Sequence, residues 1–376
     1  MASKRVGIVT FHRAMNYGAV LQAYALQQYI QAQGCTCEIV DYRSEQIENT
    51  RKLFPLRTSS LKKFISGIAN VPVRIMRKKA FSEFQKEHLK TGEAYTKQNI
   101  RQANLAYDGF FFGSDQIWNH KLSGSDLNYF GAFVSQTKKR FAYAASFGEV
   151  AVPEMLKSQY AEELAAFSDL SVREACGKER VEAMVGKAAQ IVVDPVFLLG
   201  AKHWRNFVTK NKNNDKYILL YHLQGDNTKL MRYAQFVSKA TGYKIVEFQA
   251  WANFRPSNIK PVFGGSPEDF LNMIHNAEYV ITDSFHCTAF SVIFEKVFWT
   301  GMDSRKDPKE TRSGNLLISL GLRDRILPTE LETWDFASKP EFVCAKEKLK
   351  AQVAASAAYI DSALKKMGIS NNAEVL

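Results

Sequence analysis

The chain has 376 residues, of which 46% are hydrophobic and 23% charged, and its net charge is +12. This apolar content excludes a disordered chain, and the length predicts two domains that each bury a core. No run of about 18 apolar residues occurs, and no cleavable signal pattern opens the sequence, so we expect a cytoplasmic protein. The five cysteines fit neither a disulfide framework nor a zinc pattern, so we expect reduced thiols and no metal.

The first elements along the chain predict a βαβ unit. Residues 6–11 have the apolar pattern of a buried strand, residues 19–33 are good helix formers that end at Gly34 as a cap, and residues 36–42 form a second strand. Such a unit implies a parallel sheet. The loop at residues 12–18 is only weakly similar to a dinucleotide fingerprint, because it lacks G-x-G-x-x-G.

The positive charge is concentrated in residues 51–90, where eleven Lys or Arg face two Glu and supply nine of the net +12. Apolar residues interleave with the basic ones, and Pro72 divides two expected amphipathic helices. One interpretation is a helical pair packed on the first domain with a solvated basic face. The other is peripheral contact with the anionic inner membrane leaflet. No recognition helix, zinc pattern or RNP-like motif accompanies the charge, so no nucleic-acid partner is expected.

Several apolar runs in the first half each end in a polar cluster. They lie at residues 110–112, 141–145, 170–174 and 191–195. Parallel strands carry their carboxyl ends to one edge of a sheet, so the Asp, Ser, Arg and Asn residues there are candidates for a shared cleft. For Asp194, beside a proline, a loop cap is the better interpretation.

A second α/β set begins near Lys216, after a polar spacer. Its expected elements are strands at 217–221 and 244–248, helices at about 228–240 and 314–320, a capped helix start at Ser266 with Pro267 first, and a long amphipathic helix at 345–366. The predicted architecture is therefore two Rossmann-like α/β domains that face a cleft. We place them at residues 1–205, with a basic helical insertion at about 51–95, and 206–345, followed by a C-terminal helix and tail at 346–376.

Residues 279–301 combine a short buried strand, a polar elbow and a short buried helix expected at 288–294. Asp283, Ser284, His286 and Thr288 lie in this elbow. A strand's carboxyl end that meets a helix N-terminus is where open α/β sheets bind ligands and where N–H groups favour anions. The alternative for His286 is a core histidine bonded to backbone.

Five motifs in order resemble the polysaccharide pyruvyl transferase family over roughly residues 5–325. They are Asn16-Tyr17-Gly18-Ala19, Gly113-Ser114-Asp115-Gln116 with Trp118-Asn119, Ser171-Val172-Arg173-Glu174, Asp194-Pro195 and Ser284-Phe285-His286. The resemblance implies a GT-B-like fold. It also implies transfer of the enolpyruvyl unit of phosphoenolpyruvate to two hydroxyls of a sugar in a surface-polysaccharide precursor, which gives a pyruvate ketal.

By this resemblance His286 is the catalytic histidine, which protonates the donor's methylene carbon, and Arg173 is a donor-binding arginine. The family's usual Arg-x-His reads Ser284-Phe285-His286 here, so Arg312 or Arg305 would supply the second guanidinium for the anionic donor. The alternative for Arg173 is a structural ion pair with Glu174.

The remaining expected site residues divide between the two substrates. Asp115 is expected as a base or as a ligand of the acceptor hydroxyl. The other donor residues are Ser284 and Thr288, and the acceptor residues are Asn16, Tyr17, Gly18, Ser114, Gln116, Trp118 and Asn119.

The expected partners are phosphoenolpyruvate as donor substrate and a saccharide or lipid-linked oligosaccharide as acceptor, with no cofactor. Two alternatives remain at this point. One is a GT-B glycosyltransferase that uses a nucleotide sugar, with the elbow holding the diphosphate. The other is a catalytically silent saccharide-binding protein, because an arginine of the family pattern is missing.

Overall fold

The computed structural model describes residues 4–52, 70–209, 215–223, 228–249, 259–303, 305–332 and 334–369, and the chain forms two compact units. Unit 1 comprises residues 1–51, 85–199 and 348–376, and unit 2 comprises residues 52–84 and 200–347. The basic segment, expected as part of the first domain, therefore groups mostly with unit 2. Most of the C-terminal helix groups with unit 1.

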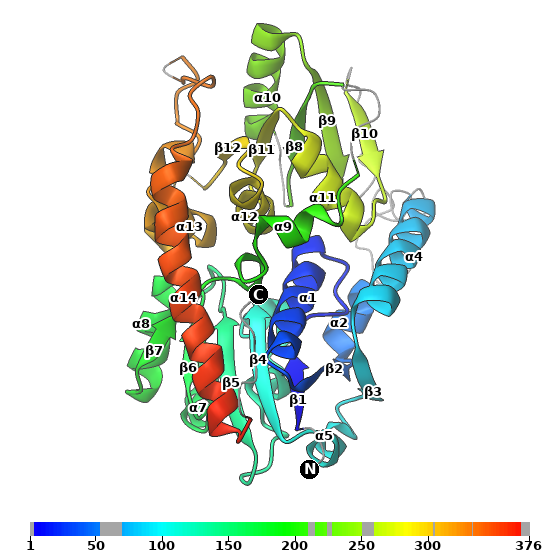
Figure 1. Ribbon diagram of the computed structural model, residues 1–376, viewed down its shortest axis with the longest axis vertical. Helices are drawn as coiled ribbons and strands as arrows, with labels where there is room; N and C mark the ends of the chain where they lie inside the picture. Colours follow the sequence, from blue (N-terminus) through cyan, green and yellow to red (C-terminus); the bar gives the residue numbers. More distant parts are fainter. Residues whose placement is uncertain are drawn as a thin grey trace. The chain divides into compact units, whose positions relative to one another are not determined.

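Unit 1 is built on a parallel sheet of seven strands in the order β3-β2-β1-β4-β5-β6-β7 (Figure 1). The strands are β1 (Arg5–Val9), β2 (Thr36–Tyr42), β3 (Thr91–Tyr95), β4 (Gly109–Asp115), β5 (Lys139–Ala145), β6 (Leu170–Val172) and β7 (Ala189–Ile191). Because the order reverses between β1 and β4, the topological switch point of this sheet lies there. The strand expected at 191–195 is wrong in position, since β7 ends at Ile191 and Asp194 caps a 3-10 turn.

Helices cover both faces of this sheet. Ala23, Leu26 and Ile30 of α1 (Tyr17–Ala32) share one apolar cluster with Ile360 and Leu364 of α14 (Phe342–Lys366). The opposite cluster includes residues of α7 (Glu154–Ala165) and α8 (Ala175–Val185). The shorter helices of unit 1 are α2 (Glu45–Thr50), α5 (Ala103–Ala106) and α6 (His120–Ser123).

Unit 2 contains a parallel sheet of five strands in the order β10-β9-β8-β11-β12. The strands are β8 (Tyr217–Tyr221), β9 (Lys244–Gln249), β10 (Lys260–Phe263), β11 (Tyr279–Thr282) and β12 (Val297–Thr300). Its helices are α9 (Gly200–Arg205), α10 (Thr228–Thr241), α11 (Pro267–Asn276), α12 (Phe285–Ile293) and α13 (Arg312–Leu320). The order reverses between β8 and β11, which is therefore the switch point of the second sheet.

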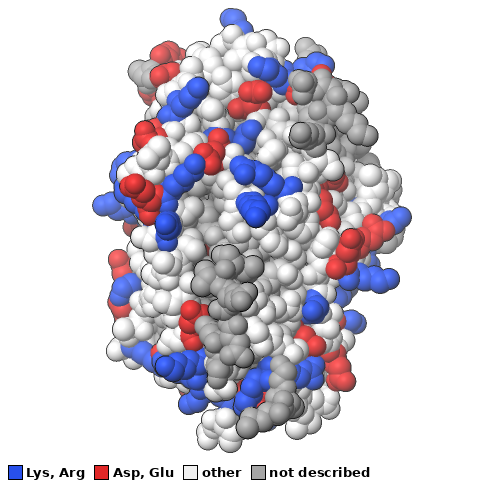
Figure 2. All heavy atoms as spheres, in the orientation of Figure 1, with Lys and Arg blue, Asp and Glu red and all other residues white. Residues whose placement is uncertain are grey.

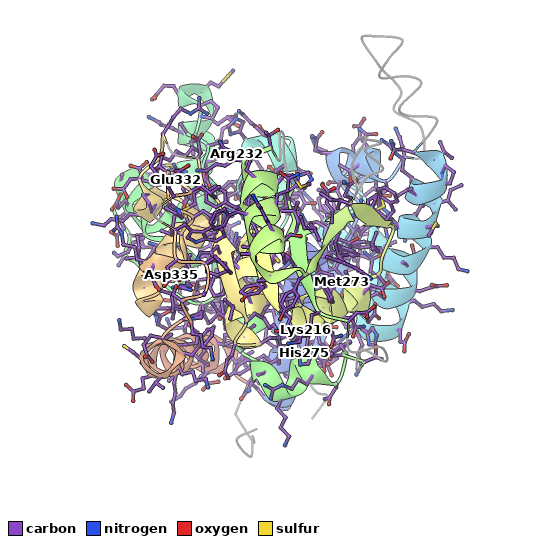
Figure 3. All side chains as sticks on the ribbon, turned by 90° about the horizontal axis from the view of Figure 1, so that it is seen from above. Lys216, Arg232, Met273, His275, Glu332 and Asp335 are labelled. Atoms are coloured by element: carbon purple, nitrogen blue, oxygen red, sulfur yellow. The ribbon has the colours of Figure 1, made fainter. Side chains whose placement is uncertain are left out.

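The core of unit 2 forms on both faces of its sheet. Leu230, Ala234 and Val237 of α10 pack on Ile281 and Trp299, and α10 with Arg232 lies over the strands when the molecule is seen from above (Figure 3). On the other face, Phe270 of α11 contacts Tyr221 and Phe290 edge to face. The predicted class of two Rossmann-like α/β domains is confirmed by these two sheets, and the cleft between them stays a prediction.

The structure describes the basic segment from residue 70 onward, and α4 (Val71–His88) begins at the next residue. Pro72 lies in the first turn of α4, where its missing N–H costs little, so it opens this helix. The first of the two expected helices falls outside the described residues. Helix α4 buries Arg77, Phe81 and Phe84, which leaves Lys78 and Lys79 exposed.

On the face of the molecule shown in Figure 2, Lys and Arg side chains are interspersed with Asp and Glu. Within the ranges that the structure describes, no helix has both the length and the apolar character needed to cross a bilayer.

Candidate functional site

Arg173 lies in a buried cluster of carboxylates in unit 1. Its guanidinium is 2.7 Å from Asp194, 3.6 Å from Glu174 and 3.8 Å from Asp115, and 3% of its side chain is exposed. Burial alone would lower the pKa of Arg173, but these three carboxylates outweigh it and raise the pKa. This is the structural ion pair that was the alternative to donor binding, extended from one carboxylate to three. Such surroundings do not favour an anionic donor.

Asp115 and Ser114 form the end of β4 beside this cluster. Asp115 has φ 71°, in the left-handed region that non-glycine residues rarely adopt and that often marks functional positions. Ser114 is fully buried, and its hydroxyl donates to the Ala144 carbonyl at 3.0 Å and lies 3.2 Å from Asp194 Oδ2. Asp115 therefore stays a candidate for contact with a substrate. Ser114 serves the fold.

The expected acceptor residues at the start of α1 hold that helix in place. The Asn16 side chain accepts from the Ala19 N–H at 3.2 Å, so α1 begins at Tyr17, two residues earlier than predicted. Tyr17 and Gly18 are buried in the first turn. An asparagine N-cap satisfies helix N–H groups, which is a sufficient reason for its presence there.

The expected acceptor residues after β4 are also engaged in the fold. Trp118 is fully buried, stacks on Phe130 and donates to the Tyr129 carbonyl at 3.2 Å. Asn119 caps α6 by accepting from the Lys121 N–H at 3.1 Å, and its amide donates to Gln116 at 2.9 Å. The side chains of Trp118, Ser114 and Tyr17 are enclosed in the core, and their expected roles as acceptor ligands stay predictions.

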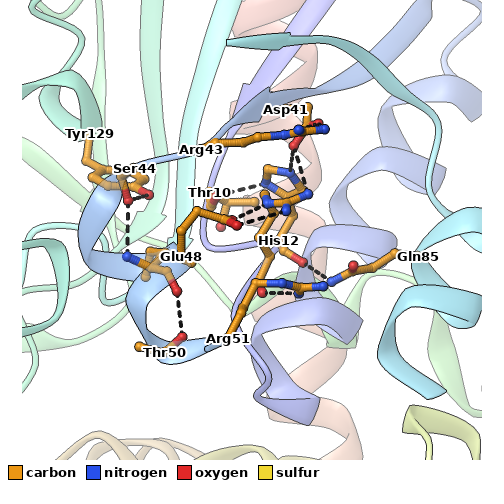
Figure 4. A network of polar contacts seen from close by, with 12 residues as sticks. Thr10, His12, Asp41, Arg43, Ser44, Glu48, Thr50, Arg51, Gln85 and Tyr129 are labelled. Atoms are coloured by element: carbon orange, nitrogen blue, oxygen red, sulfur yellow. Dashed lines mark hydrogen bonds and ion pairs between the residues drawn. The ribbon is translucent and has the colours of Figure 1, made fainter. Parts of the chain in front are cut away.

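A charged network after β1 and β2 was not predicted from the sequence (Figure 4). His12 is buried, with Nδ1 at 3.2 Å from the Thr10 carbonyl and Nε2 at 3.1 Å from Asp41 Oδ1. Both ring nitrogens lie within hydrogen-bond distance of oxygen atoms, which fixes the orientation of the ring. Arg43 donates to Asp41 Oδ2 at 2.8 Å, and Arg13 joins Asp41 to Glu48 of α2. The available signal was two polar residues at the ends of neighbouring strands.

The same network lies beside a polar pocket of about 880 Å³ within unit 1. The pocket opens between the end of β2, α2 and the segment 123–132, and amide, hydroxyl and carboxylate side chains dominate its lining. At its wall the Tyr42 hydroxyl donates to Asp126 at 2.5 Å and accepts from Asn128 at 2.9 Å. None of the seven expected acceptor residues lines this pocket. Planar amides and hydroxyls in a concave polar site suit a hydroxyl-rich ligand.

In unit 2, hydroxyl groups fix the elbow after β11. Ser284 is the N-cap of α12, and its side chain accepts from the Cys287 N–H at 3.4 Å. Thr288 is fully buried, donates to the Ser284 carbonyl at 3.0 Å and bonds Thr300 at 2.9 Å. Helix α12 therefore begins at Phe285, earlier than predicted, and the elbow is shorter. Both residues that were expected to bind the donor have structural roles in these contacts.

His286 lies in the first turn of α12 and is 6% exposed. Helix α13 packs against α12, and the guanidinium of Arg312, its first residue, lies 5.9 Å from the ring centroid of Phe285. Gly314 permits this helix start, because a Cβ there would lie 2.1 Å from the Pro308 carbonyl oxygen. Arg312 at the N-terminus of α13 therefore lies beside Phe285, the first residue of α12 and the chain neighbour of His286.

The second candidate for the missing arginine is placed differently. The Arg305 side chain is 87% exposed and pairs with Asp303 at 2.8 Å. Side-chain hydrogen bonds to Asp303 raise the pKa of Arg305. Arg312, beside the elbow, is therefore the better placed of the two arginines.

Fold and strand-end residues together define a GT-B-like two-domain α/β protein. A provisionally named UDP-N-acetylglucosamine 2-epimerase from Listeria monocytogenes has a similar structure, with a TM-score of 0.55 and 12% identity, covering 100% of this chain and 99% of the other. The S. aureus MnaA–UDP structure has a TM-score of 0.53 and 11% identity, covering 98% of each chain. Both likenesses concern the fold. Comparison with curated proteins finds no match.

The sequence profile of one family, polysaccharide pyruvyl transferase, matches residues 16–300. The chain belongs to this family and is a transferase. The matched range begins at Asn16 and includes Asp115, Arg173 and His286. The resemblance predicted from the five motifs is thereby confirmed.

Proposed function

We propose that the protein transfers the enolpyruvyl unit of phosphoenolpyruvate to two hydroxyls of a sugar in a surface-polysaccharide precursor and forms a pyruvate ketal. The observation that carries this proposal is that His286 lies in the first turn of α12, whose first residue Phe285 is 5.9 Å from Arg312 at the start of α13, in a chain of the polysaccharide pyruvyl transferase family. Helix N-termini and a guanidinium favour an anionic donor, and an imidazole can move a proton.

Ketal formation divides into proton transfers that these residues can serve. His286 protonates the methylene carbon of the donor, which makes the adjacent carbon electrophilic. Arg312 binds the donor's carboxylate or phosphate and takes the role of the arginine that Ser284 replaces in the family pattern. Ser284 and Thr288 contribute by holding the elbow that carries His286.

The acceptor is assigned to unit 1. Its polar pocket offers amides and carboxylates for sugar hydroxyls, and Asp115 in its left-handed conformation is a further candidate contact. A lipid-linked oligosaccharide would be reached at the inner leaflet of a membrane, where the basic residues of α4 would meet anionic lipid. The protein would then act in the cytoplasm as a peripheral membrane enzyme.

A donor panel tests the proposal on the full chain. Thermal unfolding is followed with phosphoenolpyruvate and with nucleotide sugars, because a ligand at about 100 times its Kd stabilises by about 2.7 kcal/mol. We expect phosphoenolpyruvate to raise the Tm of the wild type and to raise it less in Arg312→Ala, with Arg305→Ala as the matched control. Phosphate release with a saccharide acceptor completes the test.

The other outcomes have distinct meanings. Stabilisation by nucleotide sugars, without an effect of phosphoenolpyruvate, would replace the proposal with a GT-B glycosyltransferase. Stabilisation by saccharide alone, without phosphate release, would indicate a catalytically silent binding protein.

A further inference from the structure

Three titratable side chains that the proposed chemistry does not use meet at the carboxyl edge of the unit 2 sheet. His222 directly follows β8 and Asp283 directly follows β11, and the register that pairs Tyr221 with Thr282 sets the two residues side by side. Glu247 comes from β9, on the other side of β8. The cluster therefore spans the switch point of this sheet, the position where open α/β sheets bind ligands.

The contacts within this cluster link the imidazole to Glu247 and the backbone beside it to Asp283. His222 Nε2 lies 3.3 Å from Glu247 Oε1, with 11% and 7% of the two side chains exposed. The Leu223 N–H, next in the chain, donates to Asp283 Oδ1 at 2.8 Å. Burial raises the pKa of Asp283, while the Leu223 N–H and the charge of His222 act in the opposite direction.

A purely structural ion pair is the simpler explanation, but the surroundings argue for more. Glu247 is a charged residue in the buried half of β9, where an apolar side chain of similar volume would be as stable or more stable. A carboxylate that holds one nitrogen of an imidazole fixes the ring's orientation and raises its basicity, as in orienting pairs of catalytic histidines.

We propose that His222, oriented by Glu247 and flanked by Asp283, is a second acid–base residue of this site. The inference rests on the proposed function, because the ketal reaction needs two groups that exchange protons. One group must give a proton to the methylene carbon. Another must take the proton of the sugar hydroxyl and pass it to the phosphate oxygen. Glu247 of β9 and Asp283 after β11 are charged groups that lie beside His222.

The proton balance assigns the second group a defined task. His286 gives a proton to the methylene carbon while the first sugar oxygen bonds to the adjacent carbon, and His222 takes the proton of that hydroxyl. His222 then returns it to the phosphate as the carbon–oxygen bond to phosphate breaks. The second sugar oxygen bonds to the same carbon, and its proton restores His286. One phosphate leaves, and both histidines end as they began.

The test compares His222→Gln and the conservative Glu247→Gln with wild type, using phosphoenolpyruvate and a panel of saccharide acceptors. His275→Gln is the matched control, because His275 lies at the opposite edge of the sheet from His222. Its carbonyl accepts a hydrogen bond from Lys296, the residue that precedes β12 at that edge. We expect His222→Gln to lower kcat by about 10²-fold or more, with the Tm and the phosphoenolpyruvate-induced shift of Tm unchanged. Glu247→Gln should move one limb of the pH–rate profile.

Full activity with an unchanged pH profile in His222→Gln would overturn the inference. So would a lower Tm in both variants with the pH profile retained, which is the result of a structural pair. If the wild type releases no phosphate from phosphoenolpyruvate, the proposed function itself fails. A downfield ring N–H resonance of His222 that disappears in Glu247→Gln then supports the orienting bond. Its absence in the wild type overturns the inference.

Discussion

The two sheets end in the same kinds of residues, but they use them differently. In unit 1, Arg173 is enclosed by Asp115, Glu174 and Asp194, and these ion pairs hold the strand ends together. In unit 2, hydroxyls hold the elbow, and His286 and Arg312 lie at two helix N-termini. The comparison teaches that strand-end positions identify where a site can form, while local charge balance separates a structural cluster from one suited to an anionic substrate.

The largest expected effect is on catalysis in unit 2. His286→Asn should lower turnover by roughly 10²- to 10⁴-fold, because the proton donor is lost, while donor binding and folding persist. Phosphate release measures turnover, and thermal unfolding with and without phosphoenolpyruvate measures folding and donor binding. His275→Asn, on α11, should retain activity. Full activity in His286→Asn, or an unfolded variant, would contradict the role of His286.

Arg173→Ala should affect stability in unit 1. Removal of one partner from a buried ion cluster leaves carboxylates uncompensated, so we expect a loss of about 3 to 5 kcal/mol in the free energy of unfolding. Urea denaturation measures this loss. A stable Arg173→Ala variant that no longer binds phosphoenolpyruvate would contradict the structural role of Arg173. The unit 1 cluster would then be a donor site.

Arg312→Ala, in contrast to Arg173→Ala, should weaken donor binding and leave the free energy of unfolding unchanged. The donor's anionic group would lose its guanidinium partner, so we expect donor binding to weaken by about 2 to 5 kcal/mol where that contact is desolvated. Calorimetric titration with phosphoenolpyruvate measures the change. Equal donor affinity in Arg312→Ala and wild type would point to another anchor.

Asp41 should make stability depend on pH in unit 1. Burial would raise its pKa, but hydrogen bonds from His12 and Arg43 and the charges of His12 and Arg13 prevail and hold the pKa well below its usual range. Stability from this group is therefore present above the unfolded pKa of about 4 and is lost as pH falls toward the lower folded value. Asp41→Asn should remove about 1.5 to 3 kcal/mol at neutral pH and flatten this acid dependence, measured by urea unfolding from pH 3 to 7. If the free energy of unfolding changed with pH in the same way in Asp41→Asn and wild type, the role of Asp41 would be refuted.

The smallest effect concerns α4, where Lys78 and Lys79 are exposed beside Ile75 and Met76, which are 50% and 55% exposed. If this face meets anionic lipid, each basic residue contributes about 1 kcal/mol, and binding weakens as salt rises. Lys78→Gln with Lys79→Gln should reduce co-sedimentation with anionic liposomes. The matched pair Lys348→Gln with Lys350→Gln should not. No co-sedimentation at low salt would leave a solvated basic face.

The sequence predicted several strands of both sheets because they are short apolar runs between polar turns, whereas β3 and β10 were not predicted. The strands at 36–42, 217–221 and 279–282 have the predicted bounds. Helix starts were predicted late, at Ala19 and Thr288, because the side chains of Asn16 and Ser284 cap their helices two or more residues earlier. Local periodicity does not reveal a cap whose partner is a backbone N–H.

The candidate site was less predictable because its contacts join distant segments. Motifs located Arg173 and His286, but only the packed structure shows that Asp115 and Asp194 both approach Arg173. The pair His222 and Glu247 was missed because one residue follows β8 and the other lies in β9, far apart in the sequence. A charged residue within an apolar strand was the one signal in the sequence that could have found it.

The position of α14 in the chain has a consequence for biosynthesis. Tyr359 donates to the Ala142 carbonyl at 2.7 Å, Ser356 accepts from the Val193 N–H at 3.0 Å, and Ile360 and Leu364 complete a core that begins with Val6 and Ile8. All segments of unit 2 have been translated by residue 347. The strands of unit 1 therefore wait for α14, which is translated after unit 2, and unit 1 completes its core second. Until then the part of this face of the unit 1 sheet that α14 covers beside α1 is exposed, so chaperone binding to the nascent chain should be greatest there.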